Sequence, residues 1–96
     1  TVAVSREPDN PKYRIARGEV YLQNRDLARA IEDYTRAVEI QPGFAAGFTQ
    51  RGIAWRLSGN LERSLEDLTR AIRIEPSSDC YYERGATYQA AGNHAK

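Results

Sequence analysis

Residues 35–42 read TRAVEIQP, and residues 69–76 read TRAIRIEP, so the two stretches closely repeat each other. The same shift along the chain aligns 9–42 with 43–76, and 11 of the aligned pairs are identical. Average residue usage gives on the order of two identities by chance. A period of this length is typical of arrays of stacked helical units.

The repeat extends toward both ends of the chain. Prolines stand at 8, 42 and 76, and the dipeptide Arg17-Gly18 recurs as Arg51-Gly52 and, one residue early, as Arg84-Gly85. We expect a window cut from a longer array, the alternative being a short protein whose last helix caps itself. The single unit, 1–96, then divides into the tail of a preceding second helix (1–8), repeat 1 (9–42), repeat 2 (43–76) and the first helix of repeat 3 (77–96).

Each period predicts two amphipathic helices. Asn10-Pro11 favours a helix start, because Asn caps a helix and Pro is tolerated in its first turn. Apolar residues of 27–38 recur at helical spacing, and Pro42 terminates that pattern. The expected helices span about 11–24, 26–40, 45–58, 61–74 and 78–91. Glycine weakens a helix interior, so the repeated Gly18, Gly52 and Gly85 predict points of close helix approach.

These positions resemble the tetratricopeptide repeat (TPR) family, whose 34-residue pattern is W-x2-L-G-x2-Y, then A-x3-F, then A and P. The second copy reads Phe48-x2-Arg51-Gly52-x2-Trp55, Ser64-x3-Leu68, Ala71 and Pro76. Arg occupies the family's usual Leu position in all three copies. The resemblance implies an all-α fold of antiparallel helix hairpins, stacked as a right-handed α-solenoid.

The composition narrows the range of functions. The 96 residues include 14 Lys and Arg against 13 Asp and Glu, for a net charge of +1. Such a balance offers no basic stripe for nucleic acid and no polybasic patch for a membrane. No run approaches the ~18 apolar residues of a membrane span. We therefore expect neither nucleic acid nor a membrane as a partner.

No catalytic or metal-binding constellation is evident. His94 has no acid or nucleophile placed beside it in the sequence, and Cys80 has only that one histidine to activate it. The residues that could bind a metal lack metal-ligand spacing, and no glycine-rich phosphate loop follows a strand. We predict a non-enzymatic chain with no catalytic residue, metal or cofactor, in which Cys80 is a small, partly buried residue.

Charged and aromatic side chains have structural interpretations. Opposite charges four residues apart on a helix stabilise it by ~0.2–0.5 kcal/mol per pair. We expect such pairs on a solvated face of the second helices: Arg29–Asp33, Glu32–Arg36, Arg63–Asp67 and Glu66–Arg70. The aromatic residues Tyr21, Trp55 and Tyr88 recur at one repeat position and are predicted to pack where hairpins meet.

The family resemblance also implies a binding surface. In TPR arrays the first helix of each pair lines a concave groove that holds a peptide. The groove candidates of this chain combine apolar residues with acidic ones, which favours a basic-apolar peptide. They are Ile15, Glu19, Leu22, Gln50, Ile53, Arg56, Leu57, Asp79, Tyr82 and Glu83.

Chaperone-binding members of the family clamp a partner's C-terminal carboxylate with Lys, Asn, Asn, Lys and Arg. The matching positions here hold Ile15, Glu19, Gln50, Asp79 and Glu83, and the three acids would repel a carboxylate. We therefore expect a protein-interaction module that does not bind chaperone tails. The alternatives are self-association through open solenoid ends and a docking or regulatory segment of a larger enzyme. A nucleic-acid reader is less favoured than either.

Overall fold

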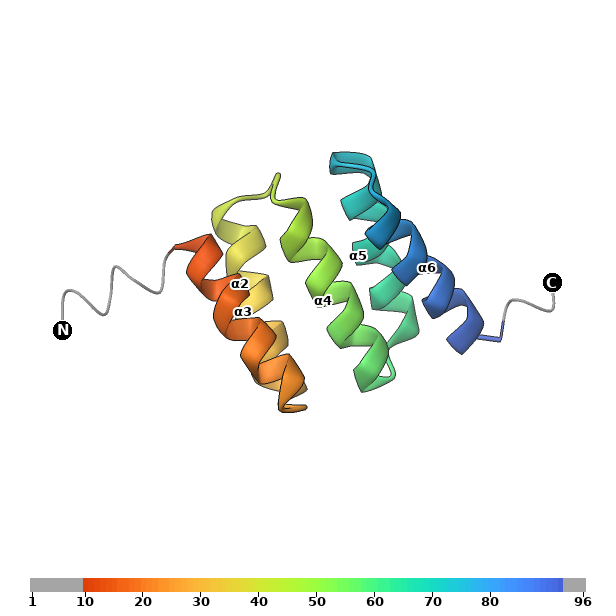
Figure 1. The fold of residues 1–96 in the computed structure, drawn as a ribbon, viewed down its shortest axis with the longest axis horizontal. Helices are drawn as coiled ribbons and strands as arrows, with labels where there is room; N and C mark the ends of the chain where they lie inside the picture. The colour runs from red at the N-terminus through yellow and green to blue at the C-terminus, as the bar shows by residue number, and fades with distance from the viewer. Residues whose placement is uncertain (1–9, 93–96) are drawn as a thin grey trace, which may run out of the picture.

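The computed structural model describes residues 10–92. It is all-α, as predicted, and its helices agree with the expected ones to within a residue at each end. With the labels of Figure 1 they are α2 (Pro11–Gln23), α3 (Leu27–Ile40), α4 (Ala45–Ser58), α5 (Leu61–Ile74) and α6 (Ser78–Ala90). The predicted tail at 1–8 and His94 lie outside the described residues.

The helices form two layers (Figure 1). Helices α2, α4 and α6 lie side by side in one layer, which we call the front layer, and α3 and α5 lie behind them. Each helix packs against the next one along the chain, so that α2 with α3 and α4 with α5 make two hairpins. Helix α4 also touches α2 and α6 within the front layer. This arrangement is the helix-hairpin array expected from the 34-residue period.

Short polar residues set the helix boundaries. The side chain of Asn10 accepts a hydrogen bond from the Lys12 backbone N–H at 2.9 Å, and Asp26 and Asn60 cap α3 and α5 in the same way. Within each hairpin the chain turns through one left-handed residue, Arg25 (φ 64°) in the first and Gly59 (φ 95°) at the equivalent position of the second. Glycine adopts this conformation readily, whereas arginine does so at some cost.

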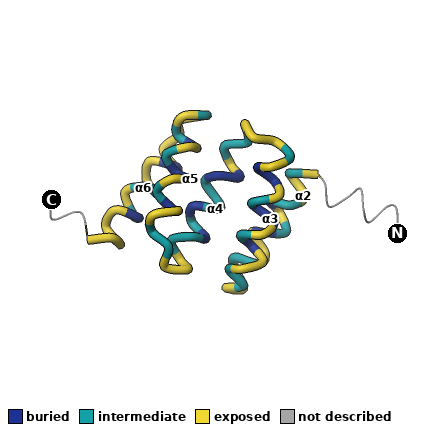
Figure 2. The backbone as a smooth tube through the Cα atoms, turned by 180° about the vertical axis from the view of Figure 1, so that it is seen from behind, coloured by how far each residue is buried: buried dark blue, intermediate teal, exposed yellow. Residues whose placement is uncertain are grey.

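Two clusters of buried side chains form the core. The first, between α2, α3 and α4, centres on Tyr34, which is completely buried. The second joins α3, α4, α5 and α6 and includes Phe48 and the free thiol of Cys80. Figure 2 shows the buried residues along the inner sides of α3, α4 and α5, while most of α6 is exposed. Cys80, which was predicted to be partly buried, is only 1% exposed and so is buried more completely than predicted.

Ion pairs formed on buried aspartates join the two helices of each hairpin. Arg17 of α2 donates two hydrogen bonds to Asp33 of α3, at 2.9 and 2.8 Å. Arg51 of α4 binds Asp67 of α5 in the same bidentate way, at 2.7 and 2.9 Å. Both aspartates are almost fully buried. The prediction of Arg29–Asp33 and Arg63–Asp67 as solvated pairs is therefore wrong, because both carboxylates turn inward to the neighbouring helix.

The remaining surface charges also pair differently from the prediction. Arg36 lies 3.5 Å from Glu39, three residues along α3, and Arg29 lies 3.7 Å from its helix cap Asp26. Neither Glu32–Arg36 nor Glu66–Arg70 is among the ion pairs found between residues 10 and 92. These exposed contacts contribute little to stability, since exposed ion pairs are typically worth less than ~1 kcal/mol.

The environment of Asp33 shows why its buried carboxylate is ionised. Burial raises the pKa of Asp33 and is the largest single effect on it. Hydrogen bonds and charge from Arg17 and Arg14 together outweigh burial, so the pKa lies below its ordinary value. The same hydrogen bonds raise the pKa of Arg17. The bridge is therefore a true ion pair at neutral pH.

Two of the three repeated glycines mark close helix approach, as predicted. A Cβ atom on Gly18 would lie 2.5 Å from Cε1 of Tyr34, and one on Gly52 would lie 2.7 Å from Cγ of Leu68. Gly85 differs, because a Cβ atom there would meet nothing within 4 Å. The prediction for Gly85 is wrong in this structure, because no described residue occupies the space that Tyr34 and Leu68 occupy in the two hairpins.

This difference gives a matched pair of substitutions. We expect Gly52→Ala to lower the free energy of unfolding by about 1–3 kcal/mol, because the added methyl group collides with Leu68. Gly85→Ala should instead raise it by up to about 1 kcal/mol through the higher helix propensity of alanine. Urea unfolding followed by circular dichroism measures both changes. A stabilising Gly52→Ala variant would contradict the close packing of α4 on α5.

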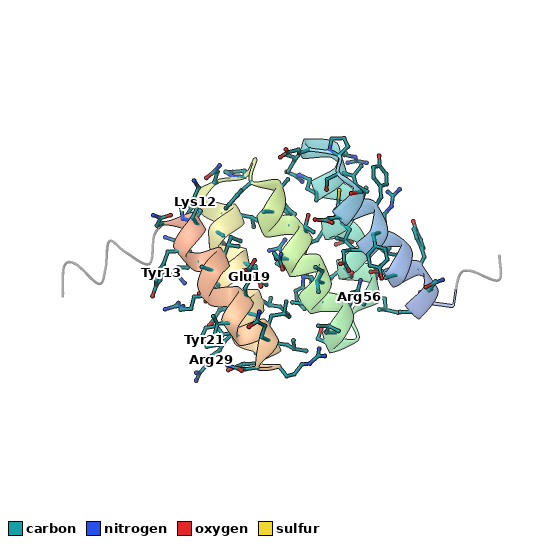
Figure 3. The ribbon with its side chains drawn as sticks, in the orientation of Figure 1. Lys12, Tyr13, Glu19, Tyr21, Arg29 and Arg56 are labelled. Carbon is teal, nitrogen blue, oxygen red and sulfur yellow. The ribbon has the colours of Figure 1, made fainter. Side chains whose placement is uncertain are left out.

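The recurring aromatic position shows the same contrast. Tyr21 and Trp55 are half-buried beneath second-helix side chains, with Arg29 stacked 5.9 Å from the Tyr21 ring and Arg63 stacked 5.4 Å from the Trp55 ring. Figure 3 shows Tyr21 and Arg29 together at the end of α2. Tyr88, at the same position of α6, is 43% exposed. Its predicted core packing is therefore not found.

Candidate functional site

The front layer carries the groove positions expected from the repeat. Glu19 is exposed on α2 and points toward the space between α2 and α4 (Figure 3). Gln50 of α4 and Asp79 of α6 lie together in one hollow of about 240 Å³, which Glu75 and Ser77 also line. The structure thus places Gln50 and Asp79 in one hollow, and their role in binding stays a prediction. Three helices, α2, α4 and α6, position these polar groups.

The hollow between α4 and α6 has a defined chemical character. It is lined by Ala45, Ala46 and Thr49 from the first turns of α4. The Thr49 hydroxyl donates a hydrogen bond to the backbone carbonyl of Ala45 at 3.1 Å. The acids Asp79 and Glu75 also line it and are exposed, so the hollow carries negative charge. Its lining by Glu75 and Ser77 was missed from sequence, because both residues lie in the α5–α6 connection.

Arg56 and Glu83 form an ion pair across the front layer. Their side chains meet at 2.8 Å, and each is about one-fifth exposed. Arg56 also donates a hydrogen bond to the backbone carbonyl of Glu83 at 3.1 Å, which ties α4 to α6. The sequence predicts Glu83 to be an acidic side chain that is open to a ligand. The structure corrects this, because the carboxylate is already paired with Arg56.

The predicted apolar strip is shorter than expected. Ile15 is only 9% exposed and belongs to the core cluster around Tyr34, so its assignment to the groove is wrong. Leu22 packs against the same cluster and is half-buried. Ile53 is also half-buried, whereas Leu57 and Tyr82 are exposed. The apolar groups available to a ligand are therefore mainly Leu57 and Tyr82, with part of Ile53.

Tyr34 of α3 lies where the core meets the front layer, because its ring packs against Gly18 of α2. Its hydroxyl is buried and has no hydrogen-bond partner within residues 10–92. Burial, and then the negative charges of Glu19 and Asp33, raise the pKa of Tyr34 above its ordinary value. A phenol is already protonated at neutral pH at its ordinary pKa, so the Tyr34 hydroxyl is uncharged there.

A second hollow, of about 490 Å³, lies on the rear side and was not predicted. It is lined mainly by α3 residues around Ile31 and Thr35, with Trp55 of α4 at its side. The guanidinium of Arg51 donates a hydrogen bond to Thr35 at 3.1 Å and so connects α4 to α3. Trp55 was predicted as core packing from its repeat position, and nothing in the 34-residue pattern distinguishes this partly open setting.

The possible metal ligands, the Cys80 thiol and the apolar character of the helices complete the chemistry of the described residues. No group of three His, Cys, Asp or Glu side chains in residues 10–92 could hold a metal ion. Cys80 is buried, and its thiol and backbone N–H form hydrogen bonds with the hydroxyl of Ser77, the N-cap of α6. No described helix combines the length and apolar character that a membrane crossing requires.

Known proteins resemble this chain both in sequence, over one repeat, and in fold. Residues 11–44 match the family model described as tetratricopeptide repeat. The first TPR domain of Spaghetti (RPAP3), solved with the HSP90 peptide SRMEEVD, superposes with a TM-score of 0.84 at 25% identity. That match covers 90% of this chain and 69% of the other. Residues 11–44 are a tetratricopeptide repeat, and the described chain has the fold of TPR domains.

Other solved TPR domains have the same fold. The first TPR domain of human RPAP3 matches with a TM-score of 0.85 at 25% identity, over 91% of this chain and 69% of that one. The Sgt2 TPR domain from Aspergillus fumigatus matches with a TM-score of 0.84 at 22% identity, over 88% of this chain and 57% of that one. A search of curated protein sequences finds no match. TPR domains are protein-binding modules, and this chain has their fold.

Proposed function

We propose that the front layer of this TPR domain binds a peptide segment with basic and apolar side chains. The observation that carries the proposal is the charge of the hollow between α4 and α6, where Asp79 and Glu75 are exposed beside Gln50. Glu19 adds a third exposed carboxylate on α2. Carboxylates at a binding surface favour Lys or Arg in the ligand and speed its association.

The apolar part of the ligand would contact Leu57 and Tyr82. These residues come from neighbouring helices of the front layer and are 40% and 73% exposed. Rigid aromatic and aliphatic surface contributes to peptide affinity, because little side-chain entropy is lost when a ligand covers it. Arg56 and Glu83 neutralise each other, so they support the α4–α6 spacing and attract neither sign of charge.

Chaperone C-terminal peptides are unfavourable ligands for this surface. The HSP90 peptide bound by the Spaghetti domain, SRMEEVD, has three acidic residues besides its C-terminal carboxylate. The clamp positions here contain a buried Ile15, an exposed Glu19 and an exposed Asp79. Arg56, a basic group of the same layer, is already paired with Glu83. We therefore infer a partner other than a chaperone tail.

A peptide-array comparison tests this function. Wild type should select peptides with Lys or Arg next to Leu or aromatic residues, and the Glu19→Lys/Asp79→Lys variant should bind them about tenfold more weakly or not at all. Fluorescence anisotropy with one selected peptide measures the change. The control is Glu62→Lys/Glu66→Lys, which alters the net charge equally on the exposed side of α5. Equal losses of peptide affinity in both variants would show that the effect comes from net charge alone.

A second peptide distinguishes the proposed specificity for basic and apolar side chains from peptide binding in general. The SRMEEVD peptide should show no measurable binding to wild type at concentrations that saturate the selected basic-apolar peptide. Tight binding of SRMEEVD would overturn the proposed specificity. If neither kind of peptide binds, the front layer is not a peptide site in this chain.

A further inference from the structure

A chain of buried hydrogen bonds joins α5 to α6. The hydroxyl groups of Ser64 and Thr87 lie 3.0 Å apart, and both residues are 0% exposed. Thr87 donates its own hydroxyl proton to the backbone carbonyl of Glu83 at 3.0 Å, so Ser64 is the donor to Thr87. Breaking such a pair is costly, because a hydroxyl that stays buried without a partner has lost its hydrogen bonds to water.

The hydrogen-bond chain extends to α4 through Arg56. Its guanidinium lies 2.8 Å from the Glu83 carboxylate and 3.5 Å from the Thr87 hydroxyl, and it donates to the Glu83 backbone carbonyl at 3.1 Å. Figure 3 shows Arg56 between α4 and α6. We call Arg56, Ser64, Glu83 and Thr87 the polar junction. It joins α6 to both helices of the second hairpin.

The same positions one repeat earlier hold apolar residues. The equivalents are Leu22 for Arg56, Ala30 for Ser64 and Ala54 for Thr87. The two alanines are completely buried in the first core cluster, and the leucine packs against it. Apolar contacts are non-directional, whereas a hydrogen bond requires a defined distance and angle between its donor and acceptor. The polar junction therefore places a geometric constraint on α6 that these positions do not place on α4.

We propose that the polar junction positions α6 and so sets the shape of the hollow between α4 and α6. Its consequence for binding rests on the proposed function, since that hollow is lined by Gln50 of α4 and Asp79 of α6. Asp79 lies about one helical turn before Glu83, so a shift of Glu83 along α6 moves both carboxylates. Ser64 and Thr87 are then positioning residues, because neither lines the hollow while both fix the helices that do.

Residual dipolar couplings of the backbone N–H groups test the positioning role in the protein alone, because they report the angle between α4 and α6. The variant is Ser64→Ala/Thr87→Val, which removes both hydroxyls and leaves neither buried without a partner. We expect the couplings of α6 to decrease relative to those of α4, while Cα chemical shifts show that α6 stays helical. Couplings equal to those of wild type would overturn the proposal.

Urea unfolding distinguishes positioning from stability. Thr87→Val alone leaves the Ser64 hydroxyl without its partner and should lower the urea midpoint by about 1 M. The double variant should be more stable than Thr87→Val, because it contains no orphaned hydroxyl. A double variant no more stable than Thr87→Val would exclude the coupling between the two hydroxyls. The control is Thr69→Val, the same change at a half-buried position of α5 outside the polar junction, which should leave the couplings of α6 unchanged.

The basic-apolar peptide selected on the array connects the polar junction to binding. The double variant should bind it about fivefold more weakly than wild type, because a less constrained α6 has to be ordered when the ligand binds. This loss is expected where both proteins are folded, and Thr69→Val should bind with wild-type affinity. Wild-type affinity in the double variant would contradict a role of the polar junction in shaping the hollow.

The proposed function and the positioning role fail in different ways. If wild type binds no peptide while the α6 couplings of the double variant decrease, the polar junction positions α6 and the proposed function is wrong. If wild type binds the peptide and the double variant equals it in both couplings and affinity, the proposed function stands and the positioning role is overturned.

Discussion

Replacing Tyr34 with alanine is expected to lower the free energy of unfolding by about 3–5 kcal/mol, as for other buried aromatic residues. Tyr34 is completely buried and contacts Gly18 as well as the cluster that contains Ile15 and Ala54. Its loss would leave a cavity between α2, α3 and α4. Domains of this size are stable by only about 5–15 kcal/mol, so the variant would be close to unfolding at room temperature.

The matched control is Tyr34→Phe, which removes only the hydroxyl. That group has no hydrogen-bond partner within residues 10–92, so its loss should change the free energy of unfolding by less than about 1 kcal/mol, or increase it. Urea unfolding monitored by circular dichroism measures both variants. A phenylalanine variant as unstable as the alanine variant would show that the hydroxyl is bonded after all.

Replacing Arg51 with alanine should cost about 3 kcal/mol, the lower end of the range for breaking a buried ion pair. The loss arises because the Asp67 side chain, 9% exposed, would keep its burial but lose both hydrogen bonds from the guanidinium. Arg51→Ala also removes the hydrogen bond to Thr35 that connects the two hairpins. Arg73→Ala, at an exposed position of α5, should change stability by less than about 0.5 kcal/mol.

A double substitution distinguishes the contribution of the ion pair to stability from the cost of burying its two charges. Arg51→Leu/Asp67→Leu removes both charges, so no carboxylate remains buried without a partner. We expect its stability to equal or exceed that of wild type, because apolar replacement of buried ion pairs is often neutral or favourable. If the double variant is as unstable as Arg51→Ala, the ion pair stabilises the fold by more than the free energy needed to bury its two charges.

The helices were predictable because their signals are local. Asn10, Pro42 and Gly59 act on the residues beside them, through capping, an absent N–H and a left-handed turn. The 34-residue period then fixed which helices pair. Close packing at Gly18 and Gly52 was predictable too, because a helix-weakening residue that recurs needs a structural reason.

The partners of the charged residues were not predictable in the same way. Asp33 and Arg29 are four residues apart, and the helical period alone indicates a solvated pair. The decisive contact comes from Arg17, 16 residues earlier on another helix. One signal was present in the sequence: Arg stands at the family's Leu position in each copy, and Asp recurs at 33 and 67. An arginine and an aspartate that recur one period later, on the two helices of each hairpin, indicate that they could pair.

The groove itself stays a prediction, and the structure shows only where its candidate residues lie. The repeat frame places Glu19, Gln50 and Asp79 on first helices, and Gln50 and Asp79 do meet in one hollow. A frame of positions does not show how deeply a residue is buried, so Ile15 was assigned to a surface that it does not reach. Nor does it show that Arg56 is long enough to reach Glu83 on the adjacent helix.

The equivalence of the two hairpin joints has a consequence for how such a gene changes length. A deletion of residues 26–59 would connect Arg25 to Asn60 and leave α2 followed directly by α5. Asp67 would then face Arg17, and Leu68 would face Gly18, so the recombined hairpin would inherit a complete set of matching groups. Duplication of the same segment would do likewise. Repeat number can therefore change by whole units while each hairpin keeps its buried bridge and its close contact at glycine, although the Arg56–Glu83 pair between neighbouring first helices would be lost in this deletion.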